Sequence, residues 1–312
     1  MKILFMGTPE FAKNHLQALV ENGYDVVAVV SQCDKPKGRG HKLTPTVVKE
    51  YALSQGIPVY QPQTLKDHAF ENELKQINPD IIVVVAYGRV LPEYILNYPK
   101  YGCINVHASL LPYYRGAAPI QWCIINGEKK SGVTTMYMEK GLDTGDMLVQ
   151  EELEIGDDET ASQLHDRLCV LGESVLCKTL EQIKSGTLVR TVQEHEKHTY
   201  APMITKETAK IDFDKPVVQI KNLVRGMNSF PLAYTSYKGE LMKVISVDAV
   251  VTAPSEACEN GTVIKAEGDA IAVKCSDGYI NIRALQFTGG KRMSTKDYLK
   301  GHVIETGVVL GQ

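Results

Sequence analysis

Residues 102–119 read GCINVHASLLPYYRGAAP, and the fold and chemistry of the whole chain are interpreted outward from this stretch. Its first part predicts a short buried strand, with apolar Ile104 and Val106 on one face. Side chains alternate along a strand, so Asn105 and His107 share the opposite face. The apolar run ends at His107, which puts the amide and the imidazole at the carboxyl end of the strand. In open α/β sheets, ligands bind at that edge.

A second stretch, residues 142–146, reads LDTGD and supplies a carboxylate, Asp143, from a loop. An amide N–H and an imidazole can both donate hydrogen bonds to an oxyanion. A carboxylate can orient the imidazole or accept a proton from an attacking amine. No serine or cysteine nucleophile is needed when the substrate brings its own amine. The residues therefore indicate acyl transfer to an amine, with Asn105 and His107 at the developing oxygen charge and Asp143 as proton acceptor.

Strands alternate with helices along the first part of the chain. Apolar runs at residues 2–6, 24–31 and 81–86 predict buried strands, and Thr8 is expected to cap the helix after the first of them. The order strand, helix, strand predicts a right-handed parallel unit. A single glycine follows the first strand, where a dinucleotide-binding turn would read G-x-G-x-x-G. We therefore expect an N-terminal Rossmann-like, mostly parallel α/β sheet flanked by helices, without a dinucleotide.

A long helix is predicted after residue 160. Thr160 and Gln163 have the spacing of a capping box, and the apolar pattern continues to a stop near Gly186. Within this helix, His165 and Cys169 are spaced as two metal ligands can be. No third or fourth ligand lies nearby in the sequence, so packing of the helix is the preferred interpretation of both residues.

The pattern changes after residue 204, where a short helix precedes a series of strands. Strand patterns lie near residues 232–237, 241–251, 261–266, 270–274 and 279–287, with turn signals between them. Five strands in such a short stretch predict a small closed sheet, interpreted as an OB-fold-like β-barrel. The expected organisation is a catalytic domain at 1–189, a polar linker at 190–205 and the OB-like domain at 206–312.

Composition limits the classes of protein that fit. The chain has 312 residues, 44% hydrophobic and 23% charged, which is typical of a globular protein. Its net charge of −3 gives no global sign of nucleic-acid binding, so such a partner would need local basic patches. Seven cysteines without a CxxC pair indicate reduced thiols. With no signal peptide and no apolar run of about 18 residues, we expect a cytoplasmic enzyme without a membrane partner.

Several longer motifs carry a family resemblance. The Asn-x-His pair is followed by SLLP and YRGAAPIQW, and later by GLDTGDM. GTPEFA, DKPKGRGHKL and VVAYGRVLP follow or end earlier strands, and APMITKETAKIDF precedes the last domain. Together these motifs resemble the folate-dependent formyltransferases. Over essentially the whole chain they are similar to the methionyl-tRNA formyltransferase family.

The resemblance implies a reaction and its partners. The co-substrate would be 10-formyltetrahydrofolate, and the formyl group would pass to the free α-amine of methionyl initiator tRNA, supporting translation initiation. The reaction would run through a tetrahedral oxyanion stabilised by Asn105 and a protonated His107. Asp143 would hold the imidazole and help to remove the amine proton. Neither a metal ion nor DNA is implied.

The resemblance also implies two sets of binding residues. For the folate these are Arg89, Val90, Leu91, Ser109, Leu110, Leu111, Pro112 and Gly141, and for the tRNA they are Lys35, Lys37, Arg39, Lys42, Lys291 and Arg292. By composition alone, the loop at residues 32–43 would be a solvated surface loop, and Lys291 and Arg292 would be ordinary surface charges. The resemblance favours a loop that contacts tRNA, with Arg39 as its base-pair-reading residue.

Three alternatives stay open at this point. A glycinamide ribonucleotide formyltransferase would share the three polar residues but leave the C-terminal domain and the DKPKGRG loop without a role. A nucleotide-sugar formyltransferase would share the catalytic core and differ in its amine acceptor. A catalytically inert tRNA-binding module is a different class, which the presence of Asn105, His107 and Asp143 disfavours. The isomer of the Leu111–Pro112 bond is not fixed by the sequence.

Overall fold

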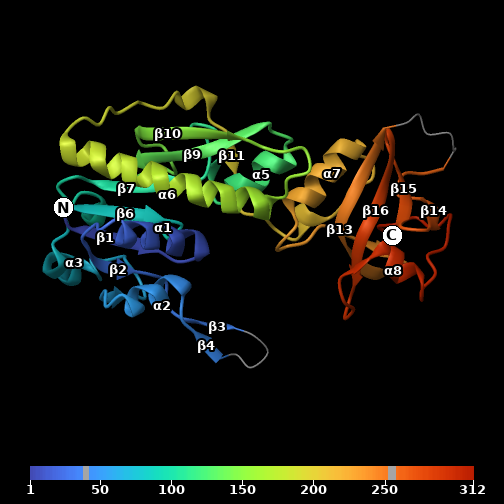
Figure 1. Ribbon diagram of the computed structural model, residues 1–312, viewed down its shortest axis with the longest axis horizontal. Coiled ribbons are helices and arrows are strands. Elements are labelled where there is room, and N and C mark those ends of the chain that lie inside the picture. Colours follow the sequence, from blue (N-terminus) through green and yellow to red (C-terminus); the bar gives the residue numbers. More distant parts are fainter. Residues whose placement is uncertain (38–41, 252–257) are drawn as a thin grey trace. The chain divides into compact units, whose positions relative to one another are not determined.

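The computed structural model describes residues 1–37, 42–251 and 258–312 (Figure 1). The chain forms two compact units, each assembled from separate segments. The first unit contains Met1–Gly116, Ser131–Leu153 and His165–Tyr200. The second contains Ala117–Lys130, Glu154–Leu164 and Ala201–Gln312. The domain boundaries at residues 189 and 206 remain a prediction.

The first unit is built on a seven-stranded sheet in the order β10-β9-β7-β6-β1-β2-β5. Its strands are β1 (Ile3–Gly7), β2 (Val26–Val30), β5 (Val59–Tyr60), β6 (Ile81–Val85), β7 (Cys103–His107), β9 (Lys130–Tyr137) and β10 (Met147–Glu154). Strands β5, β2, β1, β6 and β7 are parallel to their neighbours, whereas β9 is antiparallel to β7. The predicted mostly parallel sheet is therefore confirmed.

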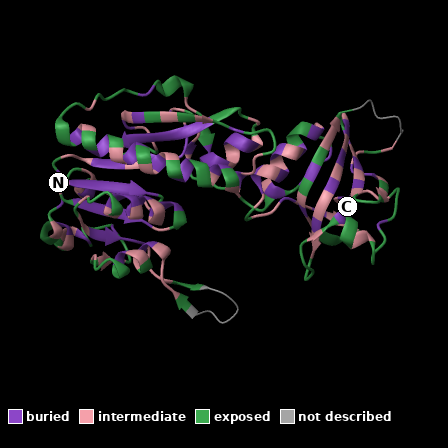
Figure 2. Ribbon diagram, in the orientation of Figure 1, coloured by how far each residue is buried: buried purple, intermediate pink, exposed green. Residues whose placement is uncertain are grey.

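Helices flank this sheet (Figure 1). They are α1 (Glu10–Glu21), α2 (Val47–Ser54), α3 (Glu71–Ile77), α4 (Glu93–Leu96) and α6 (Ala161–Ser185). Every residue of β1 and β6 is buried, as Figure 2 shows for the centre of the sheet. Strands that are covered on both faces need apolar side chains on both, which explains the uncharged run Ile81–Val85.

Two local expectations for this unit were wrong. Helix α1 begins after Pro9 without a side-chain cap, and the Thr8 hydroxyl instead donates to the Tyr87 carbonyl at 3.2 Å. The loop at residues 32–43 contains strands β3 (Lys35–Lys37) and β4 (Lys42–Thr44), which pair antiparallel.

The capping box at α6 is confirmed, because Thr160 N donates to Gln163 Oε1 at 2.9 Å and Gln163 N to Thr160 Oγ1 at 3.4 Å.

The second unit is an antiparallel sheet with short helices. Its strands are β12 (Tyr234–Tyr237), β13 (Glu240–Val251), β14 (Val263–Glu267), β15 (Ala270–Cys275), β16 (Gly278–Phe287) and β17 (Met293–Ser294), in the order β12-β13-β16-β15-β14 with β17 beside β16. Buried and partly buried residues alternate along β15 and most of β16, as Figure 2 shows for β16. The five main strands lie where the sequence predicts them and form an antiparallel sheet, so the C-terminal strand domain is confirmed, whereas its closure into a barrel stays a prediction.

The remaining elements of both units are short, apart from one helix of three turns. They are β8 (Arg115–Gly116), α5 (Pro119–Ile125), the 3₁₀ turns His195–Lys197 and Glu207–Ala209, β11 (Tyr200–Ala201), α7 (Val217–Gly226) and α8 (Thr295–Leu299). Helix α7 buries Val217, Ile220 and Val224 in the core of the second unit, together with strand residues such as Val244 and Ile282. Apolar burial of this kind is the main favourable term in the stability of such a small unit.

A buried histidine lies between α1 and α6. His15 is 0% exposed, its Nδ1 donates to the Phe11 carbonyl at 2.7 Å, and its Nε2 has no hydrogen-bond partner. A side chain at Gly172 of α6 would overlap His15 Nε2, so the glycine lets the helix pack against the ring. The ring is therefore held neutral, and burial lowers the pKa of His15 to about 4.

This burial predicts a loss of stability in mild acid. Between pH 6.5 and 4 the unfolded chain binds a proton at residue 15 that the folded chain does not, so stability is full above pH 6.5 and falls as the pH decreases. The expected loss between pH 8 and pH 5 from this one group is about 2 kcal/mol, measured as the free energy of unfolding in urea.

The variant His15→Leu should lose this part of the pH dependence, whereas His302→Leu, which removes an exposed histidine, should keep it. His15→Asn, which retains an N–H donor, serves as a second non-titrating variant if leucine perturbs folding. An unchanged acid loss in both His15 variants would contradict the assignment.

Candidate active site

Strand β7 brings Asn105 and His107 to one edge of the sheet. Asn105 is opposite Val84 of β6 and Met136 of β9, and His107 is opposite Thr134. Successive side chains of a strand point to opposite faces, so Asn105 and His107 share the face opposite buried Ile104 and Val106. This is the arrangement predicted from the alternating sequence.

The imidazole of His107 lies beside the carboxylate of Asp143. The distance from Nδ1 to Oδ2 is 3.8 Å, and the two side chains are only 7% and 13% exposed. The other ring nitrogen, Nε2, is 2.9 Å from the carbonyl oxygen of Tyr114. A carbonyl can only accept, so Nε2 carries a hydrogen in this contact and Nδ1 faces the carboxylate. Protonation of Nδ1 would give an imidazolium next to a negative charge.

The Asp143 loop is held by hydrogen bonds from two directions. Its Oδ2 accepts from the backbone N–H of Gly116 at 2.8 Å, and its carbonyl accepts from Gln193 Nε2 at 2.9 Å. The backbone of Asp143 has φ of 52°, a left-handed conformation that aspartate tolerates better than most residues. The structure therefore brings His107 and Asp143 together, with Asn105 two positions away on the same strand face.

The turn at Ser109–Pro112 is fixed by a partly buried polar network. Thr134 Oγ1 donates to the Ser109 carbonyl at 2.7 Å and accepts from Leu111 N at 3.2 Å. Gln150 Nε2 donates to the Leu111 carbonyl at 3.0 Å and to Thr134 Oγ1 at 2.8 Å. The Leu111–Pro112 peptide bond is cis. Four of the predicted folate residues, including Leu110, therefore belong to a turn with a defined backbone path.

Three more predicted folate residues follow β6, the parallel neighbour of β7, and so lie at the same sheet edge. Arg89 Nη1 donates to the carbonyls of Pro62 at 3.0 Å and Gln63 at 2.9 Å. Val90 is 86% exposed, whereas Leu91 is buried. An apolar side chain so exposed at the edge that carries the polar residues is available to contact a ligand.

Glycines permit close approaches near this edge. Gly88 has φ of +79°, and a side chain there would overlap Gln32 Nε2, which donates to the Tyr87 carbonyl at 2.9 Å. Gly141 is exposed, and a side chain there would overlap that of Thr144. The eighth predicted folate residue therefore lies in the Asp143 loop itself.

The residues predicted to contact tRNA lie in two places. Lys35 begins β3, with its Nζ 3.0 Å from Gln32 Oε1, and Lys37 pairs with Lys42 across the β3–β4 hairpin. Arg39 lies outside the described residues. In the second unit, Lys291 and Arg292 are exposed between β16 and β17.

Sequence reasoning missed several residues that shape the site. Thr134 and Gln150 hold the Ser109–Pro112 turn, and buried Arg115 and Gln193 lie behind the Asp143 loop. Arg115 stands in the quoted motif, but nothing in its neighbours indicates burial. Gln193 lies in the stretch interpreted as a polar linker, so the pattern gave no signal for it.

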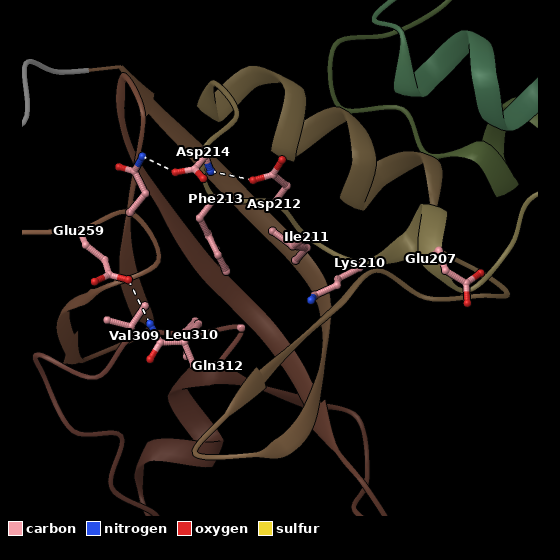
Figure 3. Close-up of a pocket in the computed structure, with 12 residues that line it drawn as sticks. Glu207, Lys210, Ile211, Asp212, Phe213, Asp214, Glu259, Val309, Leu310 and Gln312 are labelled. Carbon is pink, nitrogen blue, oxygen red and sulfur yellow. Dashed lines mark hydrogen bonds between the residues drawn. The ribbon is translucent and has the colours of Figure 1, made fainter.

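A pocket of about 460 Å³ opens in the second unit and contains none of the predicted site residues (Figure 3). Its carboxylates accept hydrogen bonds from neighbours: Asp212 from Asp214 N at 3.0 Å, Asp214 from Asn260 at 2.8 Å and Glu259 from Gln312 at 3.0 Å. These acids disfavour a phosphate ligand, so we assign the pocket no part in binding tRNA.

Two features of the described residues bear on other classes of function. Across residues 1–37, 42–251 and 258–312, no three His, Cys, Asp or Glu side chains converge as metal ligands would. In the same ranges, none of the helices combines the length and apolar character needed to cross a membrane. His165 contacts the Phe11 ring, and Cys169 accepts from Asn14 Nδ2 at 3.4 Å, as expected for packing.

Comparison with known proteins identifies the family of both parts of the chain. Residues 1–180 match the family model described as formyl transferase, and residues 203–303 match that of the formyl transferase C-terminal domain. The solved structure of an N-formyltransferase from Helicobacter canadensis, with folinic acid and dTDP-3-aminofucose, has a TM-score of 0.68. The match covers 94% of this chain and 100% of that one at 22% identity, and so supports the fold alone.

Closer relatives cover the full length. The methionyl-tRNA formyltransferases of Alkaliphilus oremlandii and Ruminiclostridium cellulolyticum are each 50% identical to this chain, over 100% of both sequences. Identity at this level extends through both family regions of the chain, and it makes this protein a member of the methionyl-tRNA formyltransferase family.

Proposed function

We propose that this protein transfers the formyl group of 10-formyltetrahydrofolate to the free α-amine of methionyl initiator tRNA, in the cytoplasm, and so supports translation initiation. The proposal rests above all on the His107–Asp143 pair beside Asn105, in a chain that is 50% identical to methionyl-tRNA formyltransferases throughout. Formyl transfer to an amine needs oxyanion stabilisation and a proton acceptor, and these residue types supply both.

The chemistry follows from the positions of the three side chains. The neutral amine attacks the formyl carbon, a C–N bond forms, and the carbonyl electrons move onto oxygen. The Asn105 amide and the protonated Nδ1 of His107 donate to that oxygen, each donor contributing about 3 kcal/mol to the transition state. Asp143 stabilises the imidazolium and takes the amine proton, directly or through a water. Collapse breaks the bond to the folate nitrogen, which leaves with a proton.

We assign the folate to the sheet edge formed by residues 89–91, residues 109–112 and the Asp143 loop. The pterin would lie against the backbone of Arg89–Leu91 and the turn Ser109–Pro112, and Gly141 would allow the Asp143 loop to approach it. This placement puts the formyl group near the carboxyl end of β7, where ligands of open α/β sheets bind.

The tRNA is assigned to the two basic sets. The loop carrying Lys35, Lys37, Arg39 and Lys42 would contact the acceptor arm, and Lys291 and Arg292 would contact phosphates from the C-terminal domain. The proposed domain organisation is a catalytic domain at 1–189, a linker at 190–205 and a tRNA-binding domain at 206–312.

The principal rival is formyl transfer to a sugar amine, because the structural neighbours include sugar N-formyltransferases. These share 22% identity with this chain, whereas the full-length relatives at 50% are methionyl-tRNA formyltransferases. Transfer of labelled formyl from the folate to methionyl-tRNA, with a nucleotide-sugar amine and a purine-pathway amine as competing acceptors, separates the candidates. Preferential labelling of either small amine would overturn the proposal.

Catalytic variants test the roles of the polar pair. His107→Ala and Asp143→Asn should each lower kcat by about 10²–10⁴-fold, because each removes a charge that acts in the transition state. The tRNA dissociation constant should stay within about threefold. Labelled-formyl transfer and filter binding measure the two effects, and His302→Ala and Asp158→Asn are exposed controls. Near-normal turnover in either variant defeats the assignment.

Arg39→Ala should lower kcat/KM for methionyl-tRNA and leave the KM for folate unchanged. Arg39→Lys should recover only part of the loss, because a point charge replaces a planar fork of donors. Steady-state kinetics with each substrate varied in turn gives both constants. A change confined to the folate KM would show that the loop serves the other substrate.

The double variant Lys291→Ala/Arg292→Ala should weaken tRNA binding and reduce its salt dependence. Removal of one side chain that binds a phosphate should lower the slope of log Kd against log salt by about one. Lys265→Ala is a matched control, because that lysine is exposed and already pairs with Glu267. Equal slopes for the double variant and the wild type would remove these residues from the interface.

A further inference from the structure

The segment that follows α6 runs alongside the Asp143 loop and β8. At one end Thr191 exchanges two backbone hydrogen bonds with Met147, at 2.8 and 2.9 Å. At the other, the Thr199 carbonyl accepts from Arg115 N at 2.9 Å and its hydroxyl from Tyr114 N at 2.8 Å. Between these ends lies Gln193, which is only 3% exposed. The expected linker is therefore part of the frame around the candidate active site.

The amide of Gln193 is fully used. Its Nε2 donates to the carbonyls of Asp143 at 2.9 Å and Gly145 at 2.7 Å. Its Oε1 accepts from Arg115 Nε at 3.1 Å and Nη2 at 2.7 Å. Carbonyls only accept and a guanidinium only donates, so the reverse orientation of the amide would lose all four bonds. The position of Gln193 is thus dictated by both of its neighbours.

These bonds close a ring through the catalytic carboxylate. Arg115, which binds Gln193, lies between Tyr114, whose carbonyl contacts His107, and Gly116, whose N–H binds Asp143 Oδ2. Gln193 connects this short strand to the backbone of Asp143. Both the carboxylate and the backbone of Asp143 are therefore connected to residues 114–116, which also contact the His107 imidazole.

Apolar packing does little to position the loop. Residues 139–142 are exposed, including Leu142, and Gly145 is the one buried residue of the range 139–146. A loop without a buried apolar side chain is held by its hydrogen bonds. A buried polar group that loses its hydrogen-bond partner lowers stability by about 1–3 kcal/mol. The hydrogen bonds from Gln193 therefore largely determine the position of Asp143.

We propose that Gln193 is a positioning residue for catalysis, which sets the distance between the Asp143 carboxylate and His107 by holding the loop carbonyls against Arg115. This inference rests on the proposed function for its kinetic consequence. Its geometric content, that Gln193 places the carboxylate, does not depend on which amine is formylated. Misplacement of a catalytic group by about 1 Å can cost on the order of 100-fold in rate.

Gln193→Glu isolates the effect, because a carboxylate still accepts from Arg115 but turns a repelling oxygen toward the two loop carbonyls. We expect kcat for formyl transfer to fall by about 10–100-fold, with both KM values within about threefold of wild type. Gln193→Met, which removes all four bonds with little change in volume, should give a similar loss. Gln286→Glu is the matched control, since Gln286 donates to the Gly290 carbonyl far along the sequence from the site.

A double-mutant cycle distinguishes positioning from general destabilisation. If Gln193 acts through Asp143, adding Gln193→Glu to Asp143→Ala should cause no further loss of kcat. An additive loss, or wild-type kcat in both the Glu and the Met variants, would overturn the proposal.

A second measurement is independent of activity. The amide ¹H shift of Gly116, read from ¹⁵N-glycine-labelled full-length protein, reports the hydrogen bond to Asp143 Oδ2. It should move in Gln193→Glu and Gln193→Met in the direction seen in Asp143→Ala, and should not move in Gln286→Glu. An unmoved Gly116 signal in both Gln193 variants overturns the positioning role. If the wild type formylates no methionyl-tRNA, the proposed function fails, and this signal still decides the role of Gln193.

Discussion

The contact between the His107 imidazole and the Asp143 carboxylate is the interaction on which the rest of the site depends. The two groups come from segments 36 positions apart, and each is held by residues 114–116, through the Tyr114 carbonyl and the Gly116 N–H. The Nδ1 and Oδ2 atoms are 3.8 Å apart, and they stay at this distance only if neither group can move away. The polar frame around them meets that condition, because the bonds are short, numerous and partly buried.

The sheet explains why the polar residues can stand together at one edge. Strands β6 and β7 are parallel, so the segments that leave them, with Arg89 and Ser109, emerge side by side. The antiparallel strand β9 then places Thr134 opposite His107, where its buried hydroxyl fixes the turn that follows β7. The antiparallel strand β9 thus supplies a polar side chain that supports the turn after β7. A sheet of parallel apolar strands alone would lack this support.

The sequence predicts those features that depend on a local period or on the chemistry of a few neighbouring residues. The pairing of Asn105 with His107 follows from alternation, and the start of α6 follows from the Thr160–Gln163 box. Tertiary partners decided the features that were missed. Pro9 and not Thr8 stands at the N-cap of α1, and the Thr8 hydroxyl donates to the Tyr87 carbonyl and accepts from Gln32 N, both in other segments. Gln193 is buried because Arg115 and the Asp143 loop enclose it. No local pattern records such long-range hydrogen bonds.

The base of the β3–β4 hairpin shows how the two proposed binding regions of the first unit are fixed relative to each other. Asp34 bonds to Lys49 and Gln61, each at 2.7 Å, and these bonds lower the pKa of Asp34, so the base stays charged and closed. Gln32 accepts from Lys35 at 3.0 Å and donates to the Tyr87 carbonyl at 2.9 Å, two residues before Arg89. A single amide therefore joins the start of the predicted tRNA loop to the predicted folate segment. Displacing the hairpin base must strain that amide or break one of its bonds, so the geometry of one region is not independent of the other.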